Sequence, residues 1–292
     1  MSATIREALQ DAIRCLTHTG SPEPRAAAEA LLADLLALPR WQLHLENHRA
    51  LSTSQRSCYA ERIARRQRGE PVQYIIGRQE FWSLEFEVNP DVLIPRPESE
   101  LLVELGARLV RQWCAAQPHE VLHLLDVGTG SGNLAASLAS ELPRSHIWGI
   151  DGSLAALRVA KRNAQRLGVA SKLTWLCGDL VTPLQDGLRR FALCVSNLPY
   201  VTTAEWQQLP QEVRMYEPPG ALLGGCDGLT LIRRFIVLSP MLLASGGSLL
   251  LEVGWKQAGA VLDILHQTGA FERTEVYHDF AGIERVVHAQ VA

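Results

Sequence analysis

The stretch Leu124-Leu125-Asp126-Val127-Gly128-Thr129-Gly130-Ser131-Gly132 decides the fold of this 292-residue chain. It places three alternating glycines directly after a short apolar run, where a buried strand must turn into a helix beginning near Asn133. Glycine tolerates positive φ, and its missing side chain lets the backbone approach a ligand closely. The stretch therefore predicts a strand, a ligand-binding turn and a helix at the centre of an α/β domain.

The glycine spacing differs from the dinucleotide fingerprint Gly-x-Gly-x-x-Gly. Counted from Gly128 the last position holds Asn133, and counted from Gly130 it holds Ala135, which some variants allow. This difference in spacing weakens the interpretation of the loop as an NAD-binding site but does not exclude it. Tight packing of a glycine turn remains the alternative to a ligand site.

Two acidic residues follow the next two expected strands. Asp151 ends the run His146–Asp151, and Asp179 follows Leu173–Cys177. An acid at the first position can accept the hydroxyls of an unphosphorylated ribose, and open α/β sheets bind ligands at the carboxyl ends of their strands. We therefore expect an adenosine-shaped slot, with Asp151 at the ribose and Asp179 on the adenine side.

Residues 97–292 alternate short apolar runs with helical stretches. We expect strands near Val121–Val127, His146–Asp151, Leu173–Cys177, Phe191–Ser196 and Ser248–Val253, and an antiparallel pair at Thr274–His278 and Arg285–Ala289. This alternation is typical of a parallel sheet with right-handed helical crossovers.

Residues 1–75 predict a small all-helical domain. Apolar side chains recur at helical spacing in Ile5–Leu16, Ala27–Leu38 and Tyr59–Ala64, and Ser21-Pro22 is the expected start of the second helix. Residues 76–96 predict a β-hairpin linker, with a turn at Asn89-Pro90-Asp91 before the apolar Val92-Leu93-Ile94.

Composition argues against several classes of protein. The net charge of −3 gives no global basic field for coating nucleic acid, although Arg62, Arg65, Arg66 and Arg68 form a local basic cluster. We expect this cluster to be a solvated face, with a docking patch for an acidic protein surface or RNA as the alternative.

The six cysteines form no Cys-x-x-Cys pair, and no apolar run is long enough to span a membrane. We expect a cytoplasmic protein with reduced thiols, no metal, no membrane segment and no stable nucleic-acid partner.

The segment Asn197-Leu198-Pro199-Tyr200 follows the fourth expected strand. The Asn197 side chain and the Leu198 backbone offer two carbonyl oxygens for the two hydrogens of a planar NH2 group, and Tyr200 can lie against the flat face of that group. In isolation the tetrapeptide would be an ordinary Asn-x-Pro turn. Its place in a glycine-loop domain favours a substrate site.

The chemistry explains why such acceptors are needed. An amide or exocyclic amino nitrogen is a poor nucleophile because its lone pair is delocalised. Positive charge grows on that nitrogen as it attacks a methyl group, and acceptors already in place stabilise this charge more than they stabilise the ground state. The site needs no ionised general base.

Together, Leu124–Gly132, Asp151 and Asn197–Tyr200 resemble class I S-adenosylmethionine-dependent methyltransferases that act on amino nitrogen. More particularly, the chain resembles the release-factor glutamine methyltransferases, the PrmC or HemK family. The further matching segments are Pro71–Gly77 with Phe81, Leu93–Glu98, Glu217-Pro218, Ala221-Leu222, Gly224-Gly225, Glu252–Gly254, and Asp279–Gly282 before Arg285.

The resemblance implies a seven-stranded Rossmann-like domain that methylates the side-chain amide of the glutamine in the Gly-Gly-Gln motif of class I peptide chain release factors. The glutamine would lie against Asn197, Leu198, Pro199 and Tyr200, with Arg96 and Pro95 as further walls, and the helical domain would help to hold the release factor. The residues implied in binding S-adenosylmethionine are Asp126, Gly128, Thr129, Gly130, Gly132, Asp151, Asp179 and Asn197.

One residue departs from the family pattern, which usually shows Asn-Pro-Pro-Tyr. Leu198 keeps the backbone carbonyl but loses the locked φ of proline, so we expect looser preorganisation and the same reaction. Asn-Leu-Pro-Tyr also resembles ribosomal-RNA adenine dimethyltransferases, although a nucleic-acid enzyme should carry a basic, aromatic-lined groove.

A sister family and a non-catalytic protein are also compatible with parts of this pattern. The sister family methylates a ribosomal-protein glutamine, and Ile94–Glu98 favours the release-factor branch over it. A cofactor-binding protein without catalysis would leave Asn197–Tyr200 unexplained.

Overall fold

The computed structural model describes residues 4–116, 121–184 and 191–292. The chain forms two compact units. One unit consists of residues 1–78 together with Pro210–Tyr216, and the other consists of Gln79–Leu209 together with Glu217–Ala292.

The first unit is helical, as the sequence predicts. Its core contains Leu9 and Leu16 from the first helix, Leu31 and Leu32 from the second, and Ile63 from the fourth. Capping boxes at Thr4 and Ser52 satisfy backbone N–H groups at the starts of the first and fourth helices. The helices of this unit are α1 (Ile5–His18), α2 (Pro24–Leu36), α3 (Arg40–Leu45), α4 (Thr53–Gln67), α5 (Val72–Ile76) and α10 (Gln211–Tyr216).

The predicted start of the second helix at Ser21-Pro22 is wrong by two residues, since α2 begins at Pro24. The reason lies in the end of α1. Gly20 has a φ of +68°, and the Ser21 N–H donates to the Leu16 carbonyl, so Ser21 still belongs to the turn that closes α1. Pro24 then takes the first-turn position that suits proline.

The predicted basic cluster is largely neutralised inside the helical unit. Arg62 pairs with Asp34, Arg65 pairs with Glu70, and Arg66 pairs with Glu212 of α10, each with an N–O distance of 2.5 Å. Arg66 is only 4% exposed. Three of the four arginines therefore bind carboxylates of their own unit.

A β-hairpin follows, but its turn is not where the sequence predicts it. Strands β1 (Arg78–Phe81) and β2 (Leu84–Glu87) pair with each other, and the turn is Trp82-Ser83, whose φ angles are +54° and +55°. Two-residue hairpin turns of this kind usually carry Asn-Gly, so Trp-Ser gives no signal. Glu100 and Glu141 accept hydrogen bonds from the Trp82 backbone and ring nitrogens and hold the turn in place.

The second unit contains a seven-stranded sheet with the order β10-β11-β9-β6-β3-β4-β5. As the sequence predicts, β10 and β11 pair antiparallel and the strands from β3 to β9 pair parallel. β11 also pairs antiparallel with β9, which the sequence pattern did not predict. The strands are β3 (Leu122–Val127), β4 (Ser145–Asp151), β5 (Leu173–Cys177), β6 (Phe191–Ser196), β9 (Leu243–Glu252), β10 (Phe271–His278) and β11 (Glu284–Val291). A separate two-stranded sheet joins β7 (Val201–Thr202) to β8 (Leu223–Gly225).

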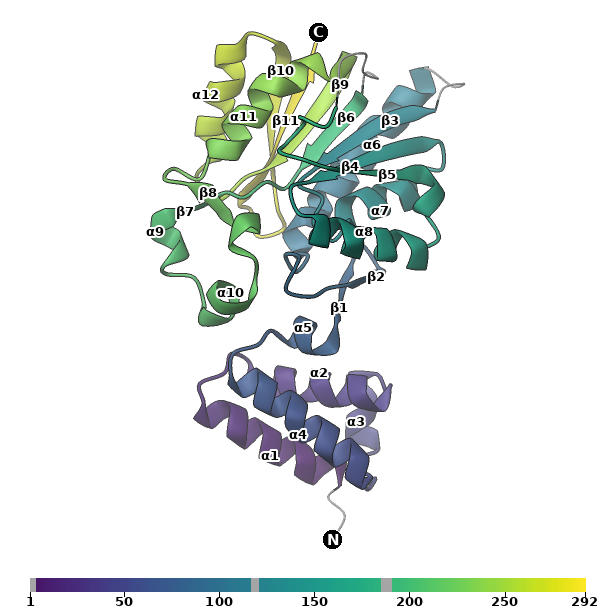
Figure 1. The fold of residues 1–292 in the computed structure, drawn as a ribbon, viewed down its shortest axis with the longest axis vertical. Helices are drawn as coiled ribbons and strands as arrows, with labels where there is room; N and C mark the ends of the chain where they lie inside the picture. Colours follow the sequence, from purple (N-terminus) through teal and green to yellow (C-terminus); the bar gives the residue numbers. More distant parts are fainter. Residues whose placement is uncertain (1–3, 117–120, 185–190) are drawn as a thin grey trace. The chain divides into compact units, whose positions relative to one another are not determined.

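Helices cover both faces of the large sheet (Figure 1). Leu124 and Leu193 pack in one apolar core with α6, α7 and α8, whereas Leu125 and Cys194 pack in a second core with α11 and α12. Neighbouring residues of a strand point to opposite faces, which explains the nearly continuous apolar strands of the sequence. The helices of this unit are α6 (Glu100–Ala116), α7 (Asn133–Glu141), α8 (Leu154–Arg166), α9 (Thr203–Trp206), α11 (Thr230–Leu238) and α12 (Ala258–Thr268).

The strand order places a topological switch point between β3 and β6. The chain runs from β3 to β4 to β5 in one direction and then returns to the other side of β3 as β6. The loops after β3 and β6 therefore diverge, and such a crevice is where open α/β sheets bind ligands. Gly128 follows β3 and Asn197 follows β6 at this crevice.

Candidate active site

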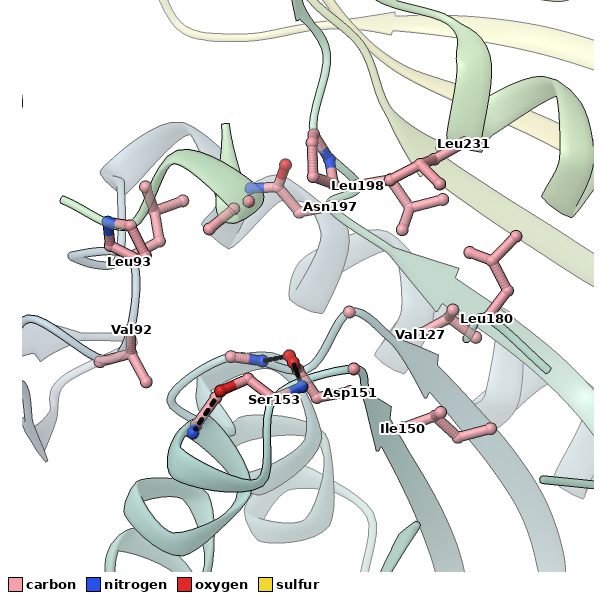
Figure 2. Close-up of a pocket in the computed structure, with 18 of the residues that line it drawn as sticks. Val92, Leu93, Val127, Ile150, Asp151, Ser153, Leu180, Asn197, Leu198 and Leu231 are labelled. Atoms are coloured by element: carbon pink, nitrogen blue, oxygen red, sulfur yellow. Dashed lines mark hydrogen bonds between the residues drawn. The ribbon is translucent and has the colours of Figure 1, made fainter. Parts of the chain in front are cut away.

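A cavity of about 370 Å³ lies at the carboxyl ends of the parallel strands. Gly128, Asp151, Asp179 and Asn197 line it, each at or just after the carboxyl end of a different strand. Figure 2 shows Asp151 and Ser153 across the cavity from Asn197 and Leu198, with Val92 and Leu93 forming a further wall. Four of the predicted site segments thus meet in one place.

The glycine-rich loop wraps back onto β4. Gly128 and Thr129 donate their backbone N–H groups to the Ile150 carbonyl, at 2.8 and 3.0 Å. The φ angles of Gly128 and Gly130 are +76° and +55°, a region that side chains rarely adopt. Gly132 is the N-cap of α7, and a Cβ there would lie 3.0 Å from the Cβ of Ala160. The loop thus needs glycine for its conformation and also for the packing of α7 against α8.

Asp126 and Thr129 lie behind this loop, outside the cavity lining. Thr129 Oγ1 and the Ala135 N–H both donate to Asp126 Oδ2, at 2.6 and 3.2 Å. Burial raises the pKa of Asp126 to about 7. The predicted cofactor contact of these two residues stays a prediction, whereas their hydrogen bonds hold the first turn of α7 to the end of β3.

Asp151 presents a carboxylate to the cavity. Its Oδ2 accepts from the Gly130 N–H at 2.9 Å, and its Oδ1 accepts from the Ser153 N–H at 2.8 Å. Burial raises the pKa of Asp151, and these two hydrogen bonds oppose that rise. Each carboxylate oxygen has a second lone pair, so the group can also accept hydroxyl protons from a ligand.

Asp179 lies at the rim of the same cavity. Its carboxylate is 60% exposed and pairs with Arg234 of α11, with an N–O distance of 2.6 Å. An exposed ion pair of this kind contributes little to stability, so the carboxylate is free to exchange partners.

The Asn197 side chain is held from one side only. Its Nδ2 donates to Ser99 Oγ at 2.9 Å, and Ser99 Oγ donates to Glu252 Oε2 at 2.5 Å. Among the described residues, no hydrogen bond reaches Asn197 Oδ1 or the Leu198 carbonyl oxygen. Asn197 and Leu198 both line the cavity. The use of their two oxygens in binding an NH2 group stays a prediction.

Tyr200 lies next to the cavity rather than in its lining. Its hydroxyl donates to Glu252 Oε1 at 3.2 Å, and burial raises the pKa of that hydroxyl. Gln257 Nε2 donates to the Tyr200 carbonyl at 3.0 Å. A Cβ at Gly228 would lie 2.2 Å from the same carbonyl oxygen, and one at Gly224 would lie 2.6 Å from the Pro199 oxygen. These glycines let neighbouring backbone pack directly against the Asn197–Tyr200 loop.

Arg96 and Pro95 also lie outside the cavity lining. Arg96 Nη2 pairs with Glu217 Oε1 at 2.5 Å, and Glu217 Oε2 accepts from the Ile94 N–H at 3.2 Å. Glu217 is 3% exposed, so this arrangement ties the Asp91–Leu93 wall to the wall that begins at Pro218. Direct contact of Arg96 or Pro95 with a substrate stays a prediction.

Sequence reasoning missed Ser99, Glu252 and Glu217 as site residues. Glu217 and Glu252 lie in segments that match the family pattern, and Ser99 directly follows one of them. The match of those segments to the family pattern was therefore the only sequence signal that could have indicated these three residues.

The described residues hold neither a metal cluster nor a membrane-spanning helix. No group of three or more His, Cys, Asp or Glu side chains there is arranged to bind a metal ion. None of the helices in the described ranges is long and apolar enough to cross a membrane. All six cysteines are free thiols.

Two family models match the chain. The first is described as the PrmC N-terminal domain and matches residues 7–77, and the second is described as a methyltransferase domain and matches residues 124–220. A Moorella thermoacetica protein named release factor glutamine methyltransferase is 43% identical to this chain, over 97% of the chain and 96% of its own length. This chain belongs to the release factor glutamine methyltransferase family.

A second member of the release factor glutamine methyltransferase family, from Geobacter sulfurreducens, is 39% identical over 99% of this chain and 97% of its own length. A solved structure, described as the hMettl16 catalytic domain in complex with MAT2A 3'UTR hairpin 1, superposes with a TM-score of 0.57 at 14% identity. The superposition covers 88% of this chain and 90% of the hMettl16 chain. At this sequence identity the similarity concerns the fold alone. The predicted family and the predicted Rossmann-like fold are confirmed, and membership of a methyltransferase family implies use of S-adenosylmethionine.

Proposed function

We propose that this chain transfers a methyl group from S-adenosylmethionine to the side-chain amide nitrogen of the glutamine in the Gly-Gly-Gln motif of class I peptide chain release factors. The observation that carries the proposal is that Asn197 and Leu198 line the same cavity as Asp151, and that no hydrogen bond within the described residues reaches Asn197 Oδ1 or the Leu198 carbonyl oxygen. Its curated relatives are named for this activity.

The cavity suits S-adenosylmethionine in size and in the groups that line it. A cavity of about 370 Å³ falls in the range of small-molecule sites. The Asp151 carboxylate would accept hydrogen bonds from the ribose hydroxyls, and Asp179 would lie on the adenine side. Gly128 and Gly130 would allow close approach of the cofactor, while Gly132 begins α7, whose N-terminal N–H groups favour a carboxylate.

When bound, S-adenosylmethionine supplies an electrophilic methyl group on a sulfonium. The residues of this chain orient the nucleophile. Asn197 Oδ1 and the Leu198 carbonyl would each accept one proton of the glutamine NH2 group, and the Tyr200 ring would limit how that group turns. Holding both reactants in line can contribute about 7–11 kcal/mol to lowering the barrier.

The charge that develops on the amide nitrogen explains the choice of acceptors. As the nitrogen forms its bond to the methyl carbon and the carbon–sulfur bond breaks, the N–H protons become more acidic. Oxygen acceptors fixed in advance bind them more strongly in the transition state than in the ground state. The methylated nitrogen then loses one proton to water, so no side chain needs to act as an ionised base.

We further propose three domains with the boundaries 1–75, 76–96 and 97–292, in which the helical domain helps to hold the release factor. Because release factors act on ribosomes, the cytoplasm is the proposed location. The proposal includes neither a stable nucleic-acid partner nor binding to a membrane.

A labelled-methyl assay with three purified acceptors tests the proposal. Each reaction contains S-adenosylmethionine labelled in its methyl group, together with a class I release factor, a ribosomal protein mixture, or tRNA and rRNA. We expect label in the release factor and none above background in the other two. Label in the nucleic acid alone would favour adenine methylation, and label in the ribosomal protein alone would favour the sister family.

A further inference from the structure

Ser99 occupies a buried position between two functional groups. It ends the short 3-10 turn Pro97–Ser99 ahead of α6, and only 1% of its surface is exposed. Its Oγ lies 2.9 Å from Asn197 Nδ2 and 2.5 Å from Glu252 Oε2. Three segments far apart in sequence thus meet at a single hydroxyl.

The hydroxyl has one proton, so the direction of its two hydrogen bonds is determined by its partners. Ser99 Oγ donates to Glu252 Oε2, and the other oxygen of Glu252 accepts from the Tyr200 hydroxyl. Ser99 must then accept from its other neighbour, which requires the NH2 group of Asn197 to point toward it. This arrangement leaves the carbonyl oxygen of Asn197 on the side away from Ser99.

Glu252 is held as an acceptor by more than one group. The Tyr200 hydroxyl donates to its other oxygen at 3.2 Å. Burial raises the pKa of Glu252, whereas the hydrogen bond from Ser99, the nearby Arg285 and the hydrogen bond from Tyr200 lower it. Arg285 is placed by Asp279 and by the Val253 carbonyl.

We propose that Ser99 and Glu252 are positioning residues that keep the Asn197 amide oriented with its oxygen toward the substrate. This inference rests on the proposed function, because the orientation matters only when the acceptor substrate is itself an NH2 group. A reversed Asn197 would set its own NH2 group against the substrate NH2 group. Neither could then accept a hydrogen bond from the other, and the developing positive charge would lose one of its two acceptors.

Kinetics of Ser99→Ala, Ser99→Thr and Ser239→Ala test the proposal. Ser239 is the matched control because it is a fully buried serine whose hydroxyl donates to a backbone carbonyl, that of Ile236, elsewhere in the unit. For methylation of the release factor we expect Ser99→Ala to lower kcat about 10- to 100-fold, with KM for the release factor and Kd for S-adenosylmethionine within about twofold of wild type. Ser99→Thr keeps the hydroxyl and should restore most of kcat, and Ser239→Ala should leave kcat within about twofold.

A double-mutant cycle separates positioning from general structural damage. If Ser99 acts through Asn197, adding Ser99→Ala to Asn197→Ala should lower kcat by less than about twofold further. Full additivity of the two losses would overturn the inference, as would an unchanged kcat in Ser99→Ala alone.

A measurement without turnover keeps this inference separate from the choice of substrate. The side-chain 15N–H2 signal of Asn197 can be assigned by its loss in Asn197→Ala. We expect its hydrogen exchange to be at least about tenfold faster in Ser99→Ala than in wild type or Ser239→Ala, because the Nδ2–Ser99 hydrogen bond is gone. Equal exchange in Ser99→Ala and wild type would overturn the positioning role, whatever substrate the enzyme methylates. Failure of the wild type to methylate release factors would instead overturn the proposed function.

Discussion

Asp126 is fully buried directly before the glycine-rich loop, yet it carries an ionisable carboxyl. Burial raises its pKa from the ordinary value of 3.8 to about 7, against the hydrogen bonds from Thr129 and Ala135. The folded protein therefore binds this proton more tightly than the unfolded chain does. The resulting contribution to stability is fully present below about pH 4 and is lost as the pH rises through about 7.

Asp126→Asn should remove this pH dependence. We expect the free energy of unfolding of the wild type, relative to that of Asp126→Asn, to fall between pH 4 and pH 8 by a few kcal/mol, since one pKa unit corresponds to about 1.4 kcal/mol. Urea denaturation of both proteins without cofactor at a series of pH values measures the difference. Asp263→Asn on α12 is the control. Parallel curves for wild type and Asp126→Asn would contradict the burial argument.

Asp151→Ala should weaken cofactor binding. The carboxylate lines the cavity, and hydrogen bonds to a charged acceptor contribute about 1.5–3 kcal/mol each. We expect the Kd for S-adenosylmethionine to rise about 10- to 100-fold by isothermal titration calorimetry, with Asp263→Ala unchanged. A Kd within twofold of wild type would show that Asp151 does not bind the ribose.

Individual residues differ in how well the sequence predicts them. Gly128, Asp151 and Asn197 were predictable because each lies at the carboxyl end of an expected strand, and parallel strands end at one edge of the sheet. Ser99 was not, since its importance depends on Asn197 and Glu252, which lie 98 and 153 residues further along the chain.

At the scale of elements, the packing of β4 against β5 restricts which residue can stand at position 149, behind the glycine-rich loop. A Cβ at Gly149 of β4 would lie 2.4 Å from Cζ3 of Trp175 in β5 and 3.2 Å from Thr129 Oγ1. The Trp175 ring thus occupies the space that any side chain at position 149 would need.

Gly149→Ala should therefore destabilise the protein by about 1–3 kcal/mol, the usual cost of overpacking a core. Gly259→Ala is a matched control because Gly259 lies in α12 and a Cβ there would meet no atom of the described residues within 4 Å. That change should stabilise the protein by about 0.5–1 kcal/mol through helix propensity. Thermal or urea denaturation measures both changes, and equal stabilities of the two variants would contradict the steric account.

Predictions of elements succeeded where the pattern was long and failed at short connections. The sheet strands and the main helices follow from extended apolar runs and helical periodicity. The hairpin turn at Trp82-Ser83 could not be predicted, because hydrogen bonds to Glu100 and Glu141 stabilise it rather than local turn chemistry.

For the whole molecule, the strand order explains why the site lies where it does. β3 and β6 are neighbours in the sheet although 63 residues separate the end of β3 from the beginning of β6, and Ser196 Oγ donates to the Val127 carbonyl at 2.5 Å. The glycine loop and the Asn197–Tyr200 loop are thereby brought to one cavity. The α/β pattern of the sequence predicted this meeting, whereas the exact walls depend on the Arg96–Glu217 contact.

The central claim is that Asn197 and the Leu198 carbonyl present a glutamine amide for methylation. Tandem mass spectrometry of a release factor treated with the enzyme and S-adenosylmethionine tests it most directly. The wild type should add one methyl group to the side-chain nitrogen of the Gly-Gly-Gln glutamine, and Asn197→Ala should lower that rate by about 100-fold or more with little change in cofactor affinity. A methyl group on any other residue, or equal methylation by Asn197→Ala, would contradict the account.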